Sequence, residues 1–122
     1  MKKENIKFKA KKTLDGKWIK GDLVHHKDSD NVWMTDFEKR LTSPIDPFTI
    51  CQFTGLKDCK GNELYEHDVI KNYPFLPSEI VWSEELSGYY LTHANGKIYE
   101  KPLGYYLSLG KFIVVGNKFD EK

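Results

Sequence analysis

The stretch that decides the fold is residues 52–70, which read Gln52-Phe53-Thr54-Gly55-Leu56-Lys57-Asp58-Cys59-Lys60-Gly61-Asn62-Glu63-Leu64-Tyr65-Glu66-His67-Asp68-Val69-Ile70. Its middle, residues 58–62, is typical of a turn, because Asp58 can accept hydrogen bonds from nearby amides and Gly61 adopts positive φ at little steric cost. An apolar pair and a polar corner follow before an extended run resumes at Val69. A carboxylate at Asp68 can accept backbone amides and hold the bend. We therefore interpret the stretch as a structural corner.

The same residues carry a resemblance to a known family. The run Gln-Phe-Thr-Gly-Leu-Lys-Asp, followed at fixed spacing by Gly61, Leu64-Tyr65-Glu66 and Asp68-Val69-Ile70, resembles the signature of the YopX family of phage and prophage proteins. Residues 6–10 resemble the opening strand of that family and residues 112–117 its closing strand and turn, so the resemblance brackets residues 6–119. The motif positions are Gln52, Gly55, Asp58, Gly61, Tyr65, Glu66, Asp68, Gly116 and Asn117.

Three residues depart from the family pattern. His67 stands where the family usually has Gly, and Phe48 and Cys51 differ in the run that leads into the central motif. The resemblance implies a mainly β protein whose later part is similar to an SH3-like barrel. It implies no established activity, cofactor or catalytic residue.

Composition favours a folded β protein of one domain. The chain has 122 residues, of which 39% are hydrophobic and 14% aromatic, and aromatic side chains favour strands. Its formal net charge is only +1, whereas a protein whose main task is to coat nucleic acid is usually more basic. With a charged start and no apolar run of signal-peptide or membrane length, we expect a cytoplasmic protein with Cys51 and Cys59 as free thiols.

The N-terminal part is predicted to form an antiparallel hairpin. Apolar and lysine side chains alternate over residues 6–11, Asp15-Gly16 is a hairpin signal, and residues 18–24 are the expected return strand. Lys7, Lys9 and Lys11 have two interpretations: the solvated face of an edge strand, where lysine discourages aggregation, or a contact with nucleic-acid phosphates. We favour the edge strand.

Residues 25–31 form the cluster that most resembles a metal site. They contain two His, two Asp and one Asn, and Asp28-x-Asp30 resembles the start of a calcium loop. However, Val32 and Trp33 occupy the positions where such a loop requires an oxygen ligand and a glycine. We therefore expect a polar hairpin loop here, without a metal.

Residues 38–47 are predicted to be a connector, because Pro44 and Pro47 suit neither a helix nor a paired strand. The connector separates a hairpin lobe, about residues 1–47, from a barrel-like part, about residues 48–122, within one domain. Residues 74–77, Pro74-Phe75-Leu76-Pro77, form a loop with an apolar tip. This tip either packs on its own barrel or is a self-association contact.

The clearest hairpin spans residues 89–100, where Asn95-Gly96 favours a type I′ turn. Tyr89, Tyr90 and Tyr99, with Trp82 on the preceding strand, are either a platform for stacking bases or ordinary cross-strand packing. Residues 103–109 are expected to be a short helical turn or an irregular plug, and residues 111–116 the most deeply buried strand. The predicted fold is therefore mainly β, with an N-terminal antiparallel hairpin region followed by a small SH3-like barrel from about residue 64 to residue 119.

The sequence lacks recognisable catalytic motifs. It contains no phosphate-binding loop, no dinucleotide fingerprint and no Gly-x-Ser-x-Gly motif. Acid–base or thiol chemistry would require a pocket that unites Glu66 or Asp68 with His67 or Cys59, and the sequence supplies no sign of one. We therefore expect no enzyme, and no catalytic, cofactor-binding or metal-binding residue.

Two functions remain to be weighed. We predict a non-enzymatic accessory protein of phages or prophages, in the cytoplasm of a bacterial host, that acts through protein contacts and homo-oligomerisation. Edge strands and exposed aromatic side chains give the physical route. The alternative is a nucleic-acid-binding module, whose candidate contacts are Lys7, Lys9, Lys11, Trp82, Tyr89 and Tyr90.

Overall fold

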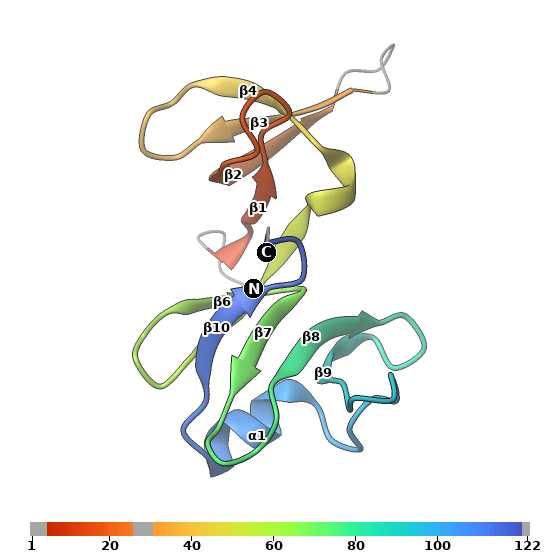
Figure 1. The fold of residues 1–122 in the computed structure, drawn as a ribbon. Helices are drawn as coiled ribbons and strands as arrows, with labels where there is room; N and C mark the ends of the chain where they lie inside the picture. Colours follow the sequence, from red (N-terminus) through yellow and green to blue (C-terminus); the bar gives the residue numbers. More distant parts are fainter. Residues whose placement is uncertain (1–4, 26–30, 121–122) are drawn as a thin grey trace. The chain divides into compact units, whose positions relative to one another are not determined.

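The computed structural model describes residues 5–25 and 31–120. It is mainly β with one short helix, as predicted (Figure 1). The chain divides into two compact units, residues 1–53 and residues 54–122. Residues 26–30 of the cluster that resembles a metal site lie outside the described residues.

The first unit is an antiparallel sheet. Its elements are β1 (Phe8–Lys11), β2 (Trp18–His25), β3 (Val32–Asp36), β4 (Thr42–Ile45), the 3-10 helix η2 (Pro47–Thr49) and the start of β5 (Cys51–Lys57). The strand order is β4-β3-β2-β1-β5. The alternation of side chains along a strand places Ala10, Ile19 and Met34 on one face, where they are buried together with Ile45.

Two predictions about this sheet are wrong. Residues 42–45 are a paired strand and not part of a connector, since Pro44 lies opposite Trp33. Proline is tolerated because β4 is the last strand of the order and the Pro44 nitrogen faces away from β3, on the side where the Pro44 carbonyl accepts the Thr13 N–H at 3.1 Å, so no hydrogen bond to β3 is lost. In addition, β1 is not an edge strand, because β2 pairs with it on one side and β5 on the other.

The second unit holds an open antiparallel sheet. Its elements are the end of β5, β6 (Glu63–Tyr65), β7 (Asp68–Lys71), β8 (Ser78–Ser83), β9 (Gly88–Leu91), α1 (Leu103–Leu109) and β10 (Ile113–Asn117). The later part of β5 lies beside β6, and the remaining strands are ordered β10-β7-β8-β9. The two edges of this order are β10 and β9, which are not paired with each other. The four strands therefore do not close into the SH3-like barrel that we expected from the sequence.

The helix α1 covers the core of the second unit. That core consists of Leu64, Ile70, Ile80, Leu91 and Leu103, all essentially buried. Tyr106 and Leu107 of the same helix pack against it, and the Gly110 N–H donates to the Tyr106 carbonyl at 3.2 Å, where the helix ends. Of the two alternatives for residues 103–109, the helix is therefore the one that forms.

Two local predictions in this unit are also wrong. The strand β10 is an edge and not the most buried strand: Val115 is 52% exposed, because the register with β7 shifts between Val114 and Gly116 and a bulge turns Val115 outward. The turn at Asn95-Gly96 is not type I′, since only Gly96 has positive φ, at 86°. The Gly96 N–H donates to the His93 carbonyl at 2.9 Å, as in a type I turn followed by a left-handed glycine.

Candidate protein-contact site

Asp58 ties the turn after β5 to the last strand. Its carboxylate accepts hydrogen bonds from the backbone N–H groups of Lys60 at 2.9 Å, Asn62 at 2.8 Å and Val114 at 3.0 Å, and from the Asn62 side chain at 3.1 Å. Burial raises the pKa of this carboxyl, but the hydrogen bonds from Val114, Asn62 and Lys60 outweigh burial and hold the pKa below its ordinary value. Gly61 completes the turn with a φ of 86°.

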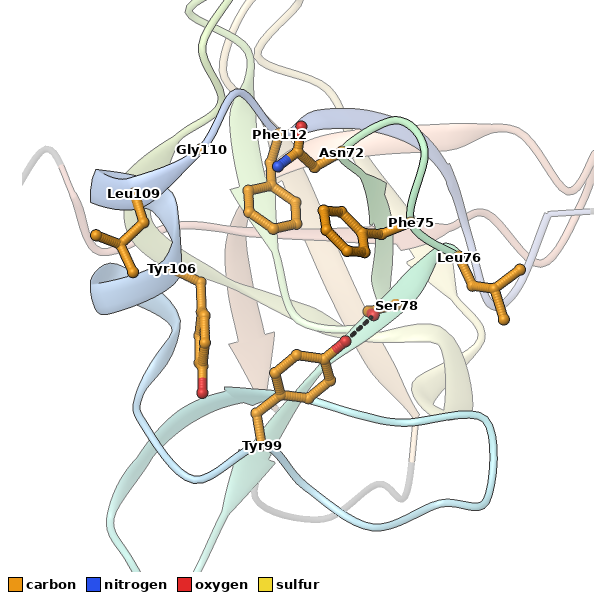
Figure 2. A pocket seen from close by; sticks show the side chains of 9 residues that line it. All are labelled: Asn72, Phe75, Leu76, Ser78, Tyr99, Tyr106, Leu109, Gly110 and Phe112. Atoms are coloured by element: carbon orange, nitrogen blue, oxygen red, sulfur yellow. Dashed lines mark hydrogen bonds between the residues drawn. The ribbon is translucent and has the colours of Figure 1, made fainter.

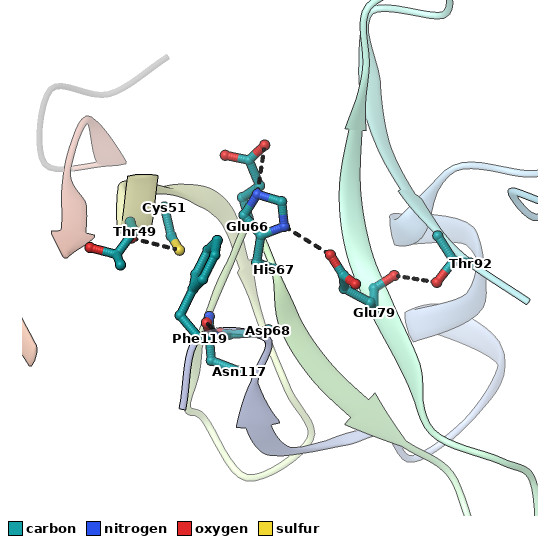
Figure 3. Close-up of polar contacts among 9 residues, drawn as sticks. All are labelled: Thr49, Cys51, Glu66, His67, Asp68, Glu79, Thr92, Asn117 and Phe119. Carbon is teal, nitrogen blue, oxygen red and sulfur yellow. Dashed lines mark hydrogen bonds and ion pairs between the residues drawn. The ribbon is translucent and has the colours of Figure 1, made fainter. Parts of the chain in front are cut away.

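Asp68 ties the corner before β7 to the closing turn. Its side chain is buried, accepts the Tyr65 N–H at 2.8 Å, and accepts the Asn117 side-chain amide at 2.9 Å (Figure 3). The Asn117 side-chain oxygen in turn accepts the Phe119 N–H at 2.9 Å. Two motif residues that are 49 positions apart, Asp68 and Asn117, are thus bonded directly.

His67 occupies a backbone conformation that glycine adopts more easily. Its φ is 70°, in the left-handed region that costs about 1–2 kcal/mol for a residue with a Cβ atom. Local contacts offset that cost: Nδ1 lies 2.8 Å from a Glu79 carboxylate oxygen, the ring meets the edge of Phe119 at 5.2 Å, and the backbone N–H donates to Ile80 at 2.7 Å (Figure 3). This explains how the corner accommodates His67 where the family usually has Gly.

Of the residues considered for acid–base or thiol chemistry, the structure brings Glu66 and His67 together. His67 lies between two carboxylates, with Nε2 3.6 Å from Glu66 and Nδ1 2.8 Å from Glu79. Cys59 is an exposed free thiol in the turn, and Cys51 is a buried one that donates to the Thr49 carbonyl at 3.3 Å. Within residues 5–25 and 31–120, no group of three or more His, Cys, Asp or Glu side chains is arranged to hold a metal ion.

The predicted aromatic platform is split between two faces of the sheet. Trp82 and Tyr89 lie opposite each other on β8 and β9, with ring centroids 5.0 Å apart and an edge-on contact. Tyr90 follows Tyr89 in the strand, so its side chain points to the other face, and it is buried. The rings of Trp82, Tyr89 and Tyr90 therefore do not form one stacking surface.

The lysines considered as alternative phosphate contacts lie in β1 and immediately before it, above aromatic rings of the first unit. The Lys7 ammonium is 4.7 Å from the centroid of Phe53, and Lys9 and Lys11 are 5.0 Å and 5.6 Å from the Trp18 ring. Trp18 is the aromatic partner that the sequence analysis missed. Trp18 lies opposite Lys11 in the pairing of β1 with β2, and a register predicted for this hairpin from the sequence could have placed it there.

Three of the most exposed apolar side chains of the second unit, Phe75, Leu76 and Leu109, line a cavity. The cavity has a volume of about 300 Å³ and is lined by Asn72, Phe75, Leu76, Ser78, Tyr99, Tyr106, Leu109, Gly110 and Phe112 (Figure 2). A second cavity of about 390 Å³ shares Phe75, Leu76, Ser78 and Tyr99 with it. The site is therefore a pair of adjoining hollows with mostly apolar and aromatic walls.

Tyr99 holds this site in shape. Its ring stacks on His93 with centroids 4.0 Å apart, meets Tyr106 edge-on at 5.1 Å, and its hydroxyl lies 3.3 Å from the Ser78 hydroxyl (Figure 2). Such a contact on three sides fixes the ring in place. The walls are thus preorganised, which lowers the entropic cost of binding a partner.

Three lining residues and Tyr73, which precedes Pro74 in the chain, expose apolar area. Tyr73 is 85% exposed, Phe75 66%, Leu76 77% and Leu109 67%. We call these four residues the apolar patch. Tyr73 is joined to Pro74 by a cis peptide bond in the same loop. Exposed apolar surface on this scale, on the order of a few hundred Å², is typical of interaction sites.

Comparison with known protein families shows the family to which the chain belongs. A family model described as YopX protein matches residues 7–121. The chain belongs to the YopX family. Curated proteins give no match. The nine YopX motif positions named from the sequence include the two buried carboxylates, Asp58 and Asp68, and the Asn117 side chain that Asp68 binds.

The other YopX motif positions have local backbone roles. Gln52 pairs with Phe8 in the ladder between β5 and β1, and Gly55 has a φ of 85°. Gly116 pairs with Val69 immediately after the bulge in β10. Glu66 contacts His67, and Tyr65 donates its hydroxyl to Glu63 at 3.1 Å. The apolar patch lies outside the motif of the YopX family.

Proposed function

We propose that this YopX-family chain is a non-enzymatic accessory protein of phages or prophages that acts through protein contacts and self-association, and that the apolar patch is its contact surface. Family membership supports the phage setting. The free thiols Cys51 and Cys59 fit a reducing cytoplasm of a bacterial host. None of the described helices has the length and apolarity to cross a bilayer.

The observation that carries the proposal is the exposure of Phe75 and Leu76 beside a preformed cavity. A loop whose apolar tip packed on its own sheet would bury these side chains, but they are 66% and 77% exposed. Burying apolar area contributes about 25 cal/mol per Å². Two aromatic rings and two leucines at one place therefore offer an anchor of the kind found at the centres of protein interfaces.

A second copy of the chain is the partner we propose for this patch. Most soluble homo-oligomers have closed symmetry, and a twofold axis places the same patch of both copies in contact. A patch made of protruding side chains next to a hollow is suited to this arrangement, because Phe75 or Leu76 of one copy can enter the hollow of the other. The described residues that line the two cavities include no Asp, Glu, Lys or Arg, so a side chain that enters them meets no unpaired charge. Beside them, the Lys71 ammonium lies 5.9 Å from the centroid of the Tyr73 ring.

Light scattering coupled to size exclusion tests the proposal. We expect the wild-type protein to have a solution mass that is a multiple of 14.3 kDa and that falls toward one copy on dilution. Phe75→Ser removes an apolar anchor, and Leu76→Asp places like charges across the twofold axis. Both variants are expected to shift the protein to the mass of a single copy.

Leu14→Asp is the matched control. Leu14 is 93% exposed and lies in the hairpin turn of the first unit. The substitution Leu14→Asp therefore introduces the same charge at a residue outside the apolar patch. We expect it to retain the wild-type mass. A wild-type mass of one copy at all concentrations, or equal loss of association in Leu14→Asp and Leu76→Asp, would overturn the proposal.

A further inference from the structure

The first unit has a sheet face that carries lysines on neighbouring strands. Lys9 and Lys11 alternate with buried Ala10 along β1, and Lys9 lies directly opposite Lys20 of β2. Lys7 immediately precedes β1, and its carbonyl accepts the Phe53 N–H at 2.9 Å. Since the buried cluster of Ala10, Ile19, Met34 and Ile45 lies on the other face, these four lysines share one side of the sheet. We call Lys7, Lys9, Lys11, Lys20 and Trp18 the basic face.

Protection of a sheet edge does not explain this arrangement. Lysines on a strand often protect a free edge from aggregation, but β1 is paired with both β2 and β5. Like-charged side chains gathered on one side of a sheet raise the local positive potential. The arrangement therefore favours the binding of an anion.

Trp18 gives the basic face a second property. Its indole lies 5.0 Å from the Lys9 ammonium and 5.6 Å from that of Lys11. A nucleobase can replace the ammonium groups on the indole, and the displaced lysines can then pair with the phosphates on either side of that base. Alternate residues of a strand are about 6.6 Å apart, so the lysines form a regular row along one direction.

We propose that the basic face binds single-stranded nucleic acid, with Trp18 stacking on a base and the lysines contacting phosphates. An aromatic ring set among lysines on a sheet is reached by an unstacked base, whereas the bases of a duplex are stacked on one another. This site belongs to the first unit. It is independent of the apolar patch, and it uses Trp18 in place of the aromatic residues of the second unit.

Fluorescence anisotropy with a labelled single-stranded oligonucleotide and with its duplex tests the proposal. We expect salt-sensitive binding that prefers the single strand. In the triple variant Lys7→Gln, Lys9→Gln, Lys11→Gln, affinity at low salt is expected to fall at least tenfold. The slope of log K against log salt is expected to decrease by about 2, since each phosphate contact on a single strand contributes about 0.7.

The control is the triple variant Lys57→Gln, Lys60→Gln, Lys111→Gln. It removes the same charge from exposed lysines of the second unit and is expected to leave the slope unchanged. Trp18→Phe retains a smaller ring and should weaken binding without changing the slope. Absence of salt-sensitive binding, equal losses in the two triple variants, or preference for the duplex would overturn the proposal. Thermal melting of each variant confirms that it is folded.

Discussion

Both units use aspartate at their turns, but in different ways. In the first unit, Asp15 accepts the Lys17 N–H at 2.9 Å, and Asp36 accepts the Glu38 and Lys39 N–H groups at 2.8 Å and 3.1 Å. All these bonds are exposed and span two or three residues.

In the second unit, Asp58 and Asp68 are buried. Besides its bonds within the turn, Asp58 binds Val114, 56 residues away; besides the Tyr65 N–H, Asp68 binds Asn117, 49 residues away. The first unit is held by strand pairing, by its apolar face and by a hydrogen bond from the Lys11 N–H to the hydroxyl of buried Thr49. The second depends in addition on two carboxylates that fasten β10, an edge strand with a bulge, to the central motif.

The largest expected effect is that of Asp68→Ala. The substitution leaves the Tyr65 N–H and the Asn117 amide buried without their acceptor, and each such loss costs about 1–3 kcal/mol. We expect the free energy of unfolding, measured from urea denaturation, to fall by about 2–4 kcal/mol. Asp15→Ala removes an exposed turn bond and is the matched control, with an effect close to the error of the measurement. Equal losses of unfolding free energy in Asp68→Ala and Asp15→Ala would contradict the proposed difference between the two units.

The pH dependence of stability is the next test. Because hydrogen bonds hold the pKa of folded Asp58 below 3.8, the unfolded chain binds more protons than the folded chain at acid pH. The stabilisation by this carboxylate is therefore present above about pH 4 and is lost as the pH falls through the folded pKa. In Asp58→Asn, we expect the difference in unfolding free energy from wild type to narrow below about pH 4. A difference that stayed constant from pH 7 to pH 2 would assign Asp58 a role independent of its charge.

The smallest expected effect belongs to the first unit. Lys9→Gln removes the like-charge pair with Lys20, but it also removes the ammonium that lies 5.0 Å from the Trp18 ring. Because the two contributions have opposite signs and similar size, we expect the unfolding free energy to change by less than about 0.5 kcal/mol. Urea denaturation at low salt measures it, and added salt should reduce the difference from wild type by screening. A loss of more than about 1 kcal/mol would show that Lys9 is needed for the fold.

Strand periodicity predicted much of the fold from sequence. The alternation in residues 6–11 and the Asp15-Gly16 turn indicated the hairpin of β1 and β2, and the central motif indicated the turn at Asp58. What failed depended on neighbours that lie far along the chain. Pro44 was excluded from pairing because its place at an edge cannot be read locally, and the apolar run at Val115 gave no sign of the bulge that exposes it.

The candidate site was predictable only in part. The apolar tip at Phe75 and Leu76 was visible between its two prolines, and it does line a cavity. Tyr99 and Tyr106, which form the walls, come from segments whose meeting depends on the path of the chain through α1. Trp18 was missed in the same way, because its contact with Lys9 and Lys11 depends on the register between two strands.

The two proposed surfaces differ in chemistry, and so they should respond oppositely to salt. The basic face attracts phosphates, so its affinity for nucleic acid should fall as ionic strength rises. Self-association through the apolar patch buries apolar surface. It should not weaken with added salt, because hydrophobic association does not depend on unscreened charges.

The most direct test of our account is the solution mass of the wild-type protein, measured by light scattering without nucleic acid at about 50 mM and about 200 mM salt. We predict a mass that is the same multiple of 14.3 kDa in both. A mass of one copy in both, or an oligomer that dissociates at the higher salt, would contradict association through the apolar patch.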